Sequence, residues 1–549
     1  MIGAVLRAKL KRMNPQYEPF FSAPAEAPEF EPLEAPLLEA PLLEAPLLEP
    51  LEAPELQEEL TLLNGHGDSA DIDPESVVEA AELLLRGGAP HDYDVVVIGA
   101  GPGGLSCATH LAANGQNVAL VERDEVGGVC LNRGCIPTKT LLESVGALRL
   151  VRRAASFGVR LDGEISGDLP QMQRRKREVV ADLRAQSEKL AEEAGVSLLR
   201  GNARLGGEGQ IELESPDGSK KTLSAVHIVL ATGGAPSKLP IEGADLPGVL
   251  TSDDILELEQ VPHRLLVLGA GAVGVEFASI FVELGACVAV IEKSGSVLPG
   301  EDEDVQREMQ RSLEESDIEL VFNSTVERIE ESPDGLRITV KGEDGEHERG
   351  AEFVLMAAGR CANIEEIGLE ETGVEIENGA IKANEDGSTS ATGVWAIGDC
   401  IRRVGWAHQA ALEGRRVADA ILGVDSDIDA RFVPACYYTF PEVASVGLSL
   451  REAEEKGMEA RVGRCEFRSN GRANTSGDNG GFVKLVVENA TGKLLGAQIV
   501  GPRATELINE IAVALRNGDT AERLADSLHA HPTFAEVLPG AARAALRGS

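Results

Sequence analysis

The sequence predicts an α/β protein that contains two similar βαβ units and ends in an α+β domain. An apolar strand followed by a Gly-rich turn occurs at residues 94–104 and again at residues 265–274. In both places a helical pattern and a second apolar strand follow, which is the order of a parallel βαβ unit. After about residue 430 the pattern changes, with strands expected at 481–487 and 494–500 and a helix at 505–517.

Length and composition limit the possible classes of protein. The chain has 549 residues, 60 glycines and few aromatic residues, which suits several α/β domains of about 150 residues each. No apolar run reaches the roughly 18 residues that cross a bilayer, so we expect a soluble protein without a membrane span. Eight cysteines do not indicate a secreted disulfide scaffold in a chain of this length. Most of them, such as Cys107 and Cys287, lie in apolar stretches where we expect buried thiols, in a reducing, cytoplasmic compartment.

The net charge of −40 argues against nucleic acid as a partner, because an acidic surface repels phosphate groups. The charge fits a solubilising surface, including one adapted to salt. It also fits docking to a basic partner, and the sequence leaves these alternatives open.

Residues 1–90 are predicted to form an N-terminal extension. Residues 1–13 are basic and apolar, which only weakly suggests an import signal. Residues 14–72 contain Glu-Ala-Pro-Leu-Leu at a period of five, a composition that disfavours helix and builds no core. We therefore expect a largely disordered linker, with a short helix beginning at Asp73-Pro74.

The first Gly-rich turn carries a dinucleotide fingerprint. Gly99, Gly101 and Gly104 follow a strand and open a helix, and Glu122 ends the next strand. Such glycines allow the backbone to approach a pyrophosphate at the helix N-terminus, and the carboxylate accepts from ribose hydroxyls.

The second turn repeats this arrangement with Gly269, Gly271, Gly274 and Glu292. A carboxylate at the last position accepts from a 2′-hydroxyl and repels a 2′-phosphate, which favours NAD over NADP. The adjacent Lys293 weakens this preference slightly. Two dinucleotide sites in one chain suit a two-electron relay between a flavin and a nicotinamide.

Cys130 and Cys135 are separated by four residues in a Gly-rich turn that leads into a helical pattern. A helix N-terminus favours the thiolate, and cysteines in this setting are more often redox-active than structural. Lys139 follows one turn later and adds positive charge.

Near the C-terminus, His531 precedes a proline and Glu536 follows five residues later. A histidine before proline is more often structural. Beside a dithiol and two nucleotide sites, however, we predict that His531 is the base of thiol exchange and that Glu536 orients it.

Three motifs together resemble the pyridine nucleotide–disulfide oxidoreductases. They are Gly128–Lys139, Ala396–Asp399 and His529–Thr533. The similarity covers about residues 92–545. It implies two Rossmann-like domains, for FAD and NAD, and a dimerisation domain. Further motifs that favour the member of this family that oxidises dihydrolipoyl groups are Ala407–Ala410, Tyr438–Gly447, Ile499–Pro502 and Glu506–Ile508.

The resemblance also implies the residues at each cofactor. Those expected at FAD are Gly99, Gly101, Gly104, Glu122, Lys139, Ala203, Ala231, Thr232, Gly233, Asp399, Ala407 and His408. Those expected at NAD are Gly269, Gly271, Gly274, Glu276, Glu292, Val326 and Gly359.

The resemblance further implies the roles of the catalytic residues. Cys130 would exchange with the substrate dithiol, and Cys135 would lie against the flavin. Lys139 would pair with Glu276 near the flavin ring. His531 would act from the partner subunit, so the active enzyme would be a homodimer that serves the lipoyl-bearing acyltransferase of a 2-oxoacid dehydrogenase complex.

The expected division of the chain follows from the same resemblance. It consists of an extension (1–90), two parts of an FAD domain (91–240 and 356–428), an NAD domain (241–355) and a dimerisation domain (429–549).

Four positions depart from the family pattern, namely Arg133, Ala362, Thr392 and Gln409. The alternatives within the family are a mercuric reductase, which should carry a vicinal cysteine pair near the C-terminus, or another disulfide reductase. A glutathione-type reductase should carry Arg in place of Glu292, and a transhydrogenase should lack Cys130. Outside the enzyme class, the chain could be a scaffold whose functional part is residues 1–90. The sequence does not distinguish which 2-oxoacid complex is served.

Overall fold

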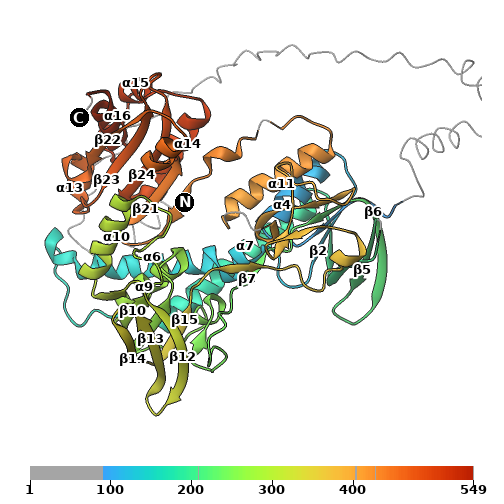
Figure 1. Cartoon of the computed structure of the whole chain (residues 1–549), viewed down its shortest axis with the longest axis horizontal. Coiled ribbons are helices and arrows are strands. Elements are labelled where there is room, and N and C mark those ends of the chain that lie inside the picture. Colours follow the sequence, from blue (N-terminus) through green and yellow to red (C-terminus); the bar gives the residue numbers. More distant parts are fainter. Residues whose placement is uncertain (1–90, 208, 402–404, 427, 548–549) are drawn as a thin grey trace, which may run out of the picture. The chain divides into compact units, whose positions relative to one another are not determined.

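A computed structural model describes residues 91–547 except 208, 402–404 and 427 (Figure 1). The linker and short helix expected within residues 1–90 lie outside the described residues. Among the described helices, none is both long enough and apolar enough to cross a membrane.

The first sheet has the strand order β3-β2-β1-β6-β5-β4, and β19 pairs with β6. Strands β1, β2, β3, β6 and β19 pair in parallel, whereas β4 and β5 form an antiparallel extension beside β6. The bounds are β1 (Tyr93–Ile98), β2 (Val118–Glu122), β3 (Ser197–Arg200), β4 (Asn202–Leu205), β5 (Gln210–Glu214), β6 (Lys220–Leu230) and β19 (Val394–Ala396). Helices α4 (Pro102–Ala113) and α11 (Ala407–Ile421) pack against each other beside this sheet. The chain therefore leaves this sheet after β6 and returns to it more than 160 residues later, at β19.

The second sheet repeats the parallel design in the order β11-β10-β9-β15-β8. Its bounds are β8 (Val249–Leu250), β9 (Arg264–Leu268), β10 (Cys287–Ile291), β11 (Ile318–Val321) and β15 (Phe353–Met356). Helices α8 (Ser252–Ile255), α9 (Ala272–Leu284) and α10 (Glu303–Glu315) belong to this unit, as does an antiparallel sheet of β12 (Thr325–Ser332), β13 (Gly335–Gly342) and β14 (Gly345–Ala351). The short strands β7 (Gly234–Pro236) and β16 (Arg360–Ala362) pair as the chain leaves and re-enters the first unit.

The C-terminal unit is antiparallel, with the strand order β20-β21-β24-β23-β22. Its strands are β20 (Ala435–Tyr437), β21 (Glu442–Gly447), β22 (Ala460–Glu466), β23 (Phe482–Glu488) and β24 (Leu494–Gly501). Its helices are α12 (Leu450–Glu455), α13 (Gly471–Ser476), α14 (Ala504–Arg516), α15 (Ala521–Asp526) and α16 (Val537–Arg547). The predicted fold class, with two parallel α/β units and a C-terminal α+β unit, is confirmed.

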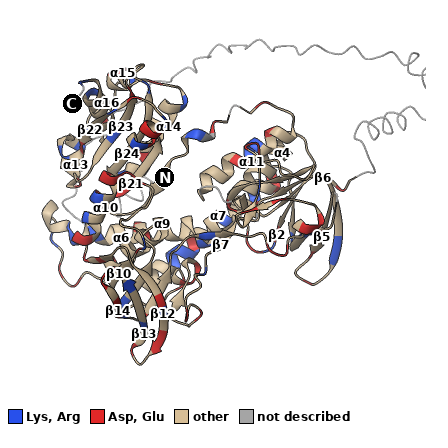
Figure 2. Ribbon diagram, in the orientation of Figure 1, with Lys and Arg blue, Asp and Glu red and all other residues tan. Residues whose placement is uncertain are grey.

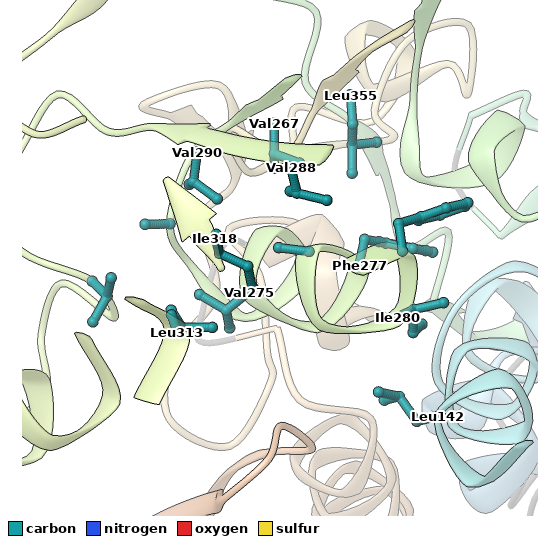
Figure 3. Close-up of a cluster of buried hydrophobic side chains, with 14 of the residues drawn as sticks. Leu142, Val267, Val275, Phe277, Ile280, Val288, Val290, Leu313, Ile318 and Leu355 are labelled. Carbon is teal, nitrogen blue, oxygen red and sulfur yellow. The ribbon is translucent and has the colours of Figure 1, made fainter. Parts of the chain in front are cut away.

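Between β2 and β3 the chain forms α5 (Gly128–Arg133), α6 (Cys135–Arg152) and α7 (Leu169–Glu193). Helix α6 packs on α9 of the second unit, and Figure 3 shows Leu142 of α6 near Ile280 of α9. One apolar core thus extends from the cysteine-bearing helix into the second βαβ unit. A shift of either helix would disturb the packing of the other, because protein interiors are close-packed.

Charged side chains also connect the second unit to the C-terminal unit. Acidic and basic residues are spread over the described elements (Figure 2), and few of them are buried. Lys484 of β23 is an exception, because its buried ammonium lies 2.6 Å from Asp302 and 2.5 Å from Asp304 at the start of α10. These ion pairs hold α10 against the C-terminal sheet.

One expectation about the cysteines is wrong. Cys107 is buried, and desolvation of its thiol raises its pKa to about 12. Cys287, however, is exposed. It is the first residue of β10, where side chains alternate between the core and solvent, so an apolar run does not fix which side its first member faces.

Candidate active site

The three glycines of the first Gly-rich turn have different structural roles. Gly99 has φ = +108°, and a Cβ there would clash with the Ala231 carbonyl. A Cβ on Gly104 would clash with the Gly99 carbonyl, so this glycine lets α4 pack against β1. A Cβ on Gly101 would meet nothing within 4 Å. The middle glycine therefore borders open space at the N-terminus of α4, where a ligand can approach the backbone.

The second turn reproduces this pattern. Gly269 has φ = +105°, a Cβ on Gly274 would clash with the Gly269 carbonyl, and a Cβ on Gly271 would meet nothing within 4 Å. The two fingerprints are thus the same structural device at the N-termini of α4 and α9.

A buried carboxylate supports each turn. Glu122 accepts hydrogen bonds from the Ala100 N–H at 2.8 Å and the Asp124 N–H at 2.9 Å. Glu292 accepts from the Ala270 N–H at 2.7 Å and the Ser294 N–H at 2.8 Å. Burial raises the pKa of Glu122 above its ordinary value. Each carboxylate lies beside the open turn of its own unit, where it can accept from a ribose hydroxyl.

A cavity of about 1100 Å³ runs past the first turn and the two cysteines. This volume is slightly larger than the usual range of about 300–1,000 Å³ for ligand sites. The predicted site residues in its wall are Gly99, Gly101, Glu122, Cys130, Cys135, Lys139, Ala203, Ala231, Thr232, Gly233, Glu276, Asp399 and Ala407.

Several predicted residues lie elsewhere. Gly104 packs beneath the first turn rather than in the wall. His408 is not in the wall either; its Nε2 lies 2.8 Å from the Pro434 carbonyl oxygen, and its ring stacks on Trp406. The residues expected at NAD surround α9 and the second sheet, and only Glu276 of them reaches this cavity.

The two cysteines belong to two helices rather than to one. Gly134 has non-helical dihedral angles (φ = −141°, ψ = −108°) and separates α5 from α6. Cys135 is therefore the first residue of α6. The Cys130 thiol donates a hydrogen bond to Cys135, which lowers the pKa of Cys135 to about 7 and raises that of Cys130. The Lys139 ammonium lowers the pKa of Cys135 further. The expected preference for thiolate therefore applies to Cys135, and Cys130 is the proton donor of the pair.

Lys139 pairs with Glu276 across the two βαβ units. The Lys139 Nζ lies 2.7 Å and 2.9 Å from the two carboxylate oxygens of Glu276. Glu276 is buried in α9, and its Oε1 also accepts the Tyr438 N–H at 3.0 Å. The predicted pair is therefore present beside Cys135, and Tyr438 is a third member that the sequence analysis did not predict.

Asp399 lines the same cavity, beside Arg360. The Arg360 Nε is 3.6 Å from Asp399 Oδ2, and the guanidinium also donates to the Gly234 carbonyl. Arg360 lines the cavity as well. Sequence reasoning missed this residue, because a single arginine after an apolar strand has no distinctive spacing.

His531 and Glu536 form a dyad away from this cavity. The His531 Nδ1 lies 2.9 Å from Glu536 Oε1, and Glu536 Oε2 accepts the Thr533 N–H at 2.8 Å. These hydrogen bonds, from Thr533 first and then from His531, lower the pKa of Glu536. The His531 side chain is 78% exposed and is not in the cavity wall. Within one chain, these hydrogen bonds orient the dyad, but it does not line the cavity that contains the sulfur pair.

Among the described residues, no group of three or more His, Cys, Asp and Glu side chains is arranged to hold a metal ion.

Comparison with known families gives two matches. The family model described as pyridine nucleotide-disulphide oxidoreductase matches residues 93–414. The dimerisation domain of the same family matches residues 433–542.

The chain is similar to curated proteins over most of its length. A dihydrolipoyl dehydrogenase of Chlorobaculum parvum is 39% identical over 457 residues, which cover 83% of this chain and 97% of that protein. A dihydrolipoyl dehydrogenase of Haloferax volcanii is 37% identical over 467 residues, 82% of this chain and 96% of that protein.

Solved structures agree with these similarities. LpdA from Mycobacterium tuberculosis superimposes with a TM-score of 0.77 at 31% identity, covering 82% of this chain and 98% of that one. The HOCl-induced flavoprotein disulfide reductase RclA from Escherichia coli superimposes with a TM-score of 0.73 at 27% identity, covering 82% and 99%.

The hydrogen bond within the sulfur pair can be tested by substitution. In the reduced protein, Cys130→Ala removes the donor and should raise the pKa of Cys135 by about 1–2 units, because a hydrogen bond to a charged group contributes about 1.5–3 kcal/mol. Cys130→Ser keeps an O–H donor and should leave the pKa of Cys135 near its present value of about 7. The measurement is the pH dependence of iodoacetamide labelling of the peptide that contains Cys135. Equal midpoints for the Ala and Ser variants would contradict the hydrogen bond.

Proposed function

We propose a function on the premise that this chain belongs to the pyridine nucleotide-disulphide oxidoreductase family, as the two family models and the relatives establish. Within that family, the chain acts as a dihydrolipoyl dehydrogenase: dihydrolipoamide and NAD⁺ give lipoamide, NADH and a proton. The observation that carries the proposal is that Cys130 and Cys135 share one cavity wall with the first dinucleotide turn.

The family implies FAD and NAD(H), and the residues present fit both. Each middle glycine, Gly101 and Gly271, borders open space at a helix N-terminus. Backbone N–H groups there can hold a pyrophosphate. Glu122 and Glu292 lie beside these turns to accept from the two adenosine riboses. When bound, FAD supplies two-electron transfer between the sulfur pair and the nicotinamide.

The thiol exchange follows from the different roles of the two sulfurs. In the oxidised enzyme, Cys130 and Cys135 form a disulfide. A substrate thiolate attacks the Cys130 sulfur, so a mixed disulfide forms and Cys135 leaves as a thiolate. The second substrate thiolate then attacks the substrate sulfur of the mixed disulfide, which releases cyclic lipoamide and the Cys130 thiolate. The low pKa of Cys135, about 7, makes it the better leaving group of the pair.

His531 takes the proton that the first substrate thiol loses, and the proton of the second thiol passes to the departing Cys130 sulfur, which ends as a thiol. Glu536 holds the His531 Nδ1, which leaves Nε2 free to act as the base. Because the His531 side chain is exposed and lies outside the cavity wall of its own chain, it serves the sulfur pair of the partner subunit. The active site is then shared between two copies of the chain.

The remaining predicted residues position the cofactors. The Lys139–Glu276 ion pair lies beside Cys135, where Lys139 stabilises the thiolate and would lie near the flavin ring of a bound FAD. Asp399 would contact the ribityl chain of FAD, and this role is supported by its position in one cavity wall with Ala203, Ala231, Thr232, Gly233 and Ala407. The Glu292 carboxylate favours NAD over NADP, because it would repel a 2′-phosphate. His408 is proposed at FAD, and Val326 and Gly359 at NAD, although none of the three lines this cavity.

At the level of the whole chain, the proposed FAD domain consists of residues 91–240 and 356–428. This division is supported by β19, which returns to the first sheet. Residues 241–355 form the NAD domain and residues 429–549 the dimerisation domain. The homodimer serves the lipoyl-bearing acyltransferase of a cytoplasmic 2-oxoacid dehydrogenase complex.

Substrate preference tests the proposed reaction. Steady-state rates should be highest with dihydrolipoamide and NAD⁺, and about tenfold lower when NADP⁺ replaces NAD⁺, because Glu292 would repel the 2′-phosphate; a tenfold ratio corresponds to about 1.4 kcal/mol. The same preparation is assayed with glutathione disulfide and Hg(II), each with NADH and NADPH. Faster turnover with either of these acceptors than with lipoamide would contradict the proposal.

Replacing the base tests the role of His531. His531→Ala should lower kcat/KM for dihydrolipoamide by about 10²- to 10⁴-fold, the usual contribution of a general base. Transfer from NADH to an artificial acceptor should be unchanged, because that half-reaction does not use the base. His529→Ala is the matched control, since His529 also pairs with a carboxylate, Glu510, at 2.8 Å. A variant at position 531 with full lipoamide activity would remove the proposed role.

A further inference from the structure

The segment Tyr437–Pro441 of the C-terminal unit lies between the cysteine-bearing helix and the second βαβ unit. Its Tyr438 contacts both members of the Lys139–Glu276 pair. We propose that Tyr438 is a positioning residue that holds the Lys139 ammonium in place beside Cys135, and so makes the electrostatics of the sulfur pair depend on the C-terminal unit. This inference rests on the proposed function and adds a residue from a third part of the fold.

Tyr438 contacts the ion pair in two ways. Its aromatic ring lies over the Lys139 ammonium, with 4.7 Å between Nζ and the ring centroid. Its main-chain N–H donates to Glu276 Oε1 at 3.0 Å. The carboxylate therefore has a fixed orientation, and the ammonium is held between that carboxylate and the ring face. A ring face attracts a cation, and most strongly where water is partly excluded.

The neighbouring residues of the segment anchor this ring. The Tyr437 hydroxyl donates to Glu301 Oε1 at 2.9 Å. The Ser312 hydroxyl of α10 donates to the Phe440 carbonyl oxygen at 2.9 Å. On the other side, the Arg149 guanidinium of α6 lies 4.9 Å from the centroid of the Phe440 ring. The segment is thus fixed to α6 and to the second unit at once, so it cannot shift without disturbing both.

The position in which Tyr438 holds the Lys139 ammonium affects the pKa of Cys135. The charged and titratable groups with the largest effects on Cys135 are the Cys130 thiol, the Lys139 ammonium and the Glu276 carboxylate. Cys436 and Tyr438 of the C-terminal unit also interact with Lys139. Lys139 lowers the pKa of Cys135 and Glu276 raises it. The resulting pKa therefore depends on the position of the Lys139 ammonium and on how much water reaches it. The Lys139 side chain is 29% exposed. The Tyr438 ring covers part of it and thereby limits screening by solvent.

Substitutions can separate the contribution of the Tyr438 ring from that of the Tyr438 main-chain N–H. Tyr438→Leu and Tyr438→Met remove the ring face but keep the main-chain N–H to Glu276, whereas Tyr438→Phe keeps both. In the two-electron-reduced holoenzyme, a long-wavelength absorbance reports the Cys135 thiolate beside the flavin, and its pH titration gives a midpoint for that thiolate. Tyr438→Leu and Tyr438→Met should raise the midpoint by about half a pH unit or more. Tyr438→Phe should match the wild type.

A double-mutant cycle tests whether the effect passes through Lys139. In a Lys139→Met background, Tyr438→Leu should shift the midpoint no further, because the cation that the ring holds is absent. Two outcomes would overturn the inference: an unchanged midpoint in folded Tyr438→Leu and Tyr438→Met, or the same shift with and without Lys139. Thermal melting and the dimer mass identify any variant that fails to fold, and the second apolar variant then decides. Absence of the long-wavelength absorbance in active wild-type enzyme would instead overturn the proposed role of Cys135.

Discussion

The hydrogen bond from the Cys130 thiol to Cys135 is the contact around which the site is arranged. It exists because Gly134 ends α5 and lets α6 begin at Cys135, which brings two sulfurs from different helices together. The bond makes the sulfurs unequal: Cys135 becomes the stabilised thiolate and Cys130 keeps its proton. In a dithiol that exchanges with a substrate, this inequality decides which sulfur is attacked and which one leaves.

The two βαβ units place this pair between two dinucleotide turns by the same physical means. In both units the first glycine requires a positive φ, the third packs against the first, and the middle one leaves the helix N-terminus open. A buried glutamate fixes each turn through its backbone N–H groups. The apolar core shared by α6 and α9 packs the cysteine-bearing helix against the helix that follows the second turn (Figure 3). The Lys139–Glu276 ion pair also joins α6 to α9, beside the two sulfurs.

Much of this could be predicted from the sequence, because glycine spacing, apolar strands and a terminal carboxylate are local signals. The two Gly-rich turns, the strand that ends at Glu122 and the strands of the C-terminal sheet lie where the sequence pattern predicts them, whereas the break between the two cysteines at Gly134 was not predicted. Contacts between remote segments leave no such signal, so Arg360 beside Asp399 and Tyr438 over Lys139 were missed. The exposure of Cys287 was also not predictable, since an apolar run does not show which side of a strand its first residue faces.

Electron uptake tests the central claim, that Cys130 and Cys135 form a redox couple in contact with a flavin. Purified enzyme is titrated anaerobically with NADH while the flavin absorbance is followed. If the disulfide accepts the first two electrons, the flavin should remain largely oxidised until more than one equivalent of NADH has been added. A Cys130→Ser variant, which lacks the disulfide, should lose its flavin absorbance with the first equivalent. Complete loss of that absorbance in the wild type at one equivalent would contradict the account.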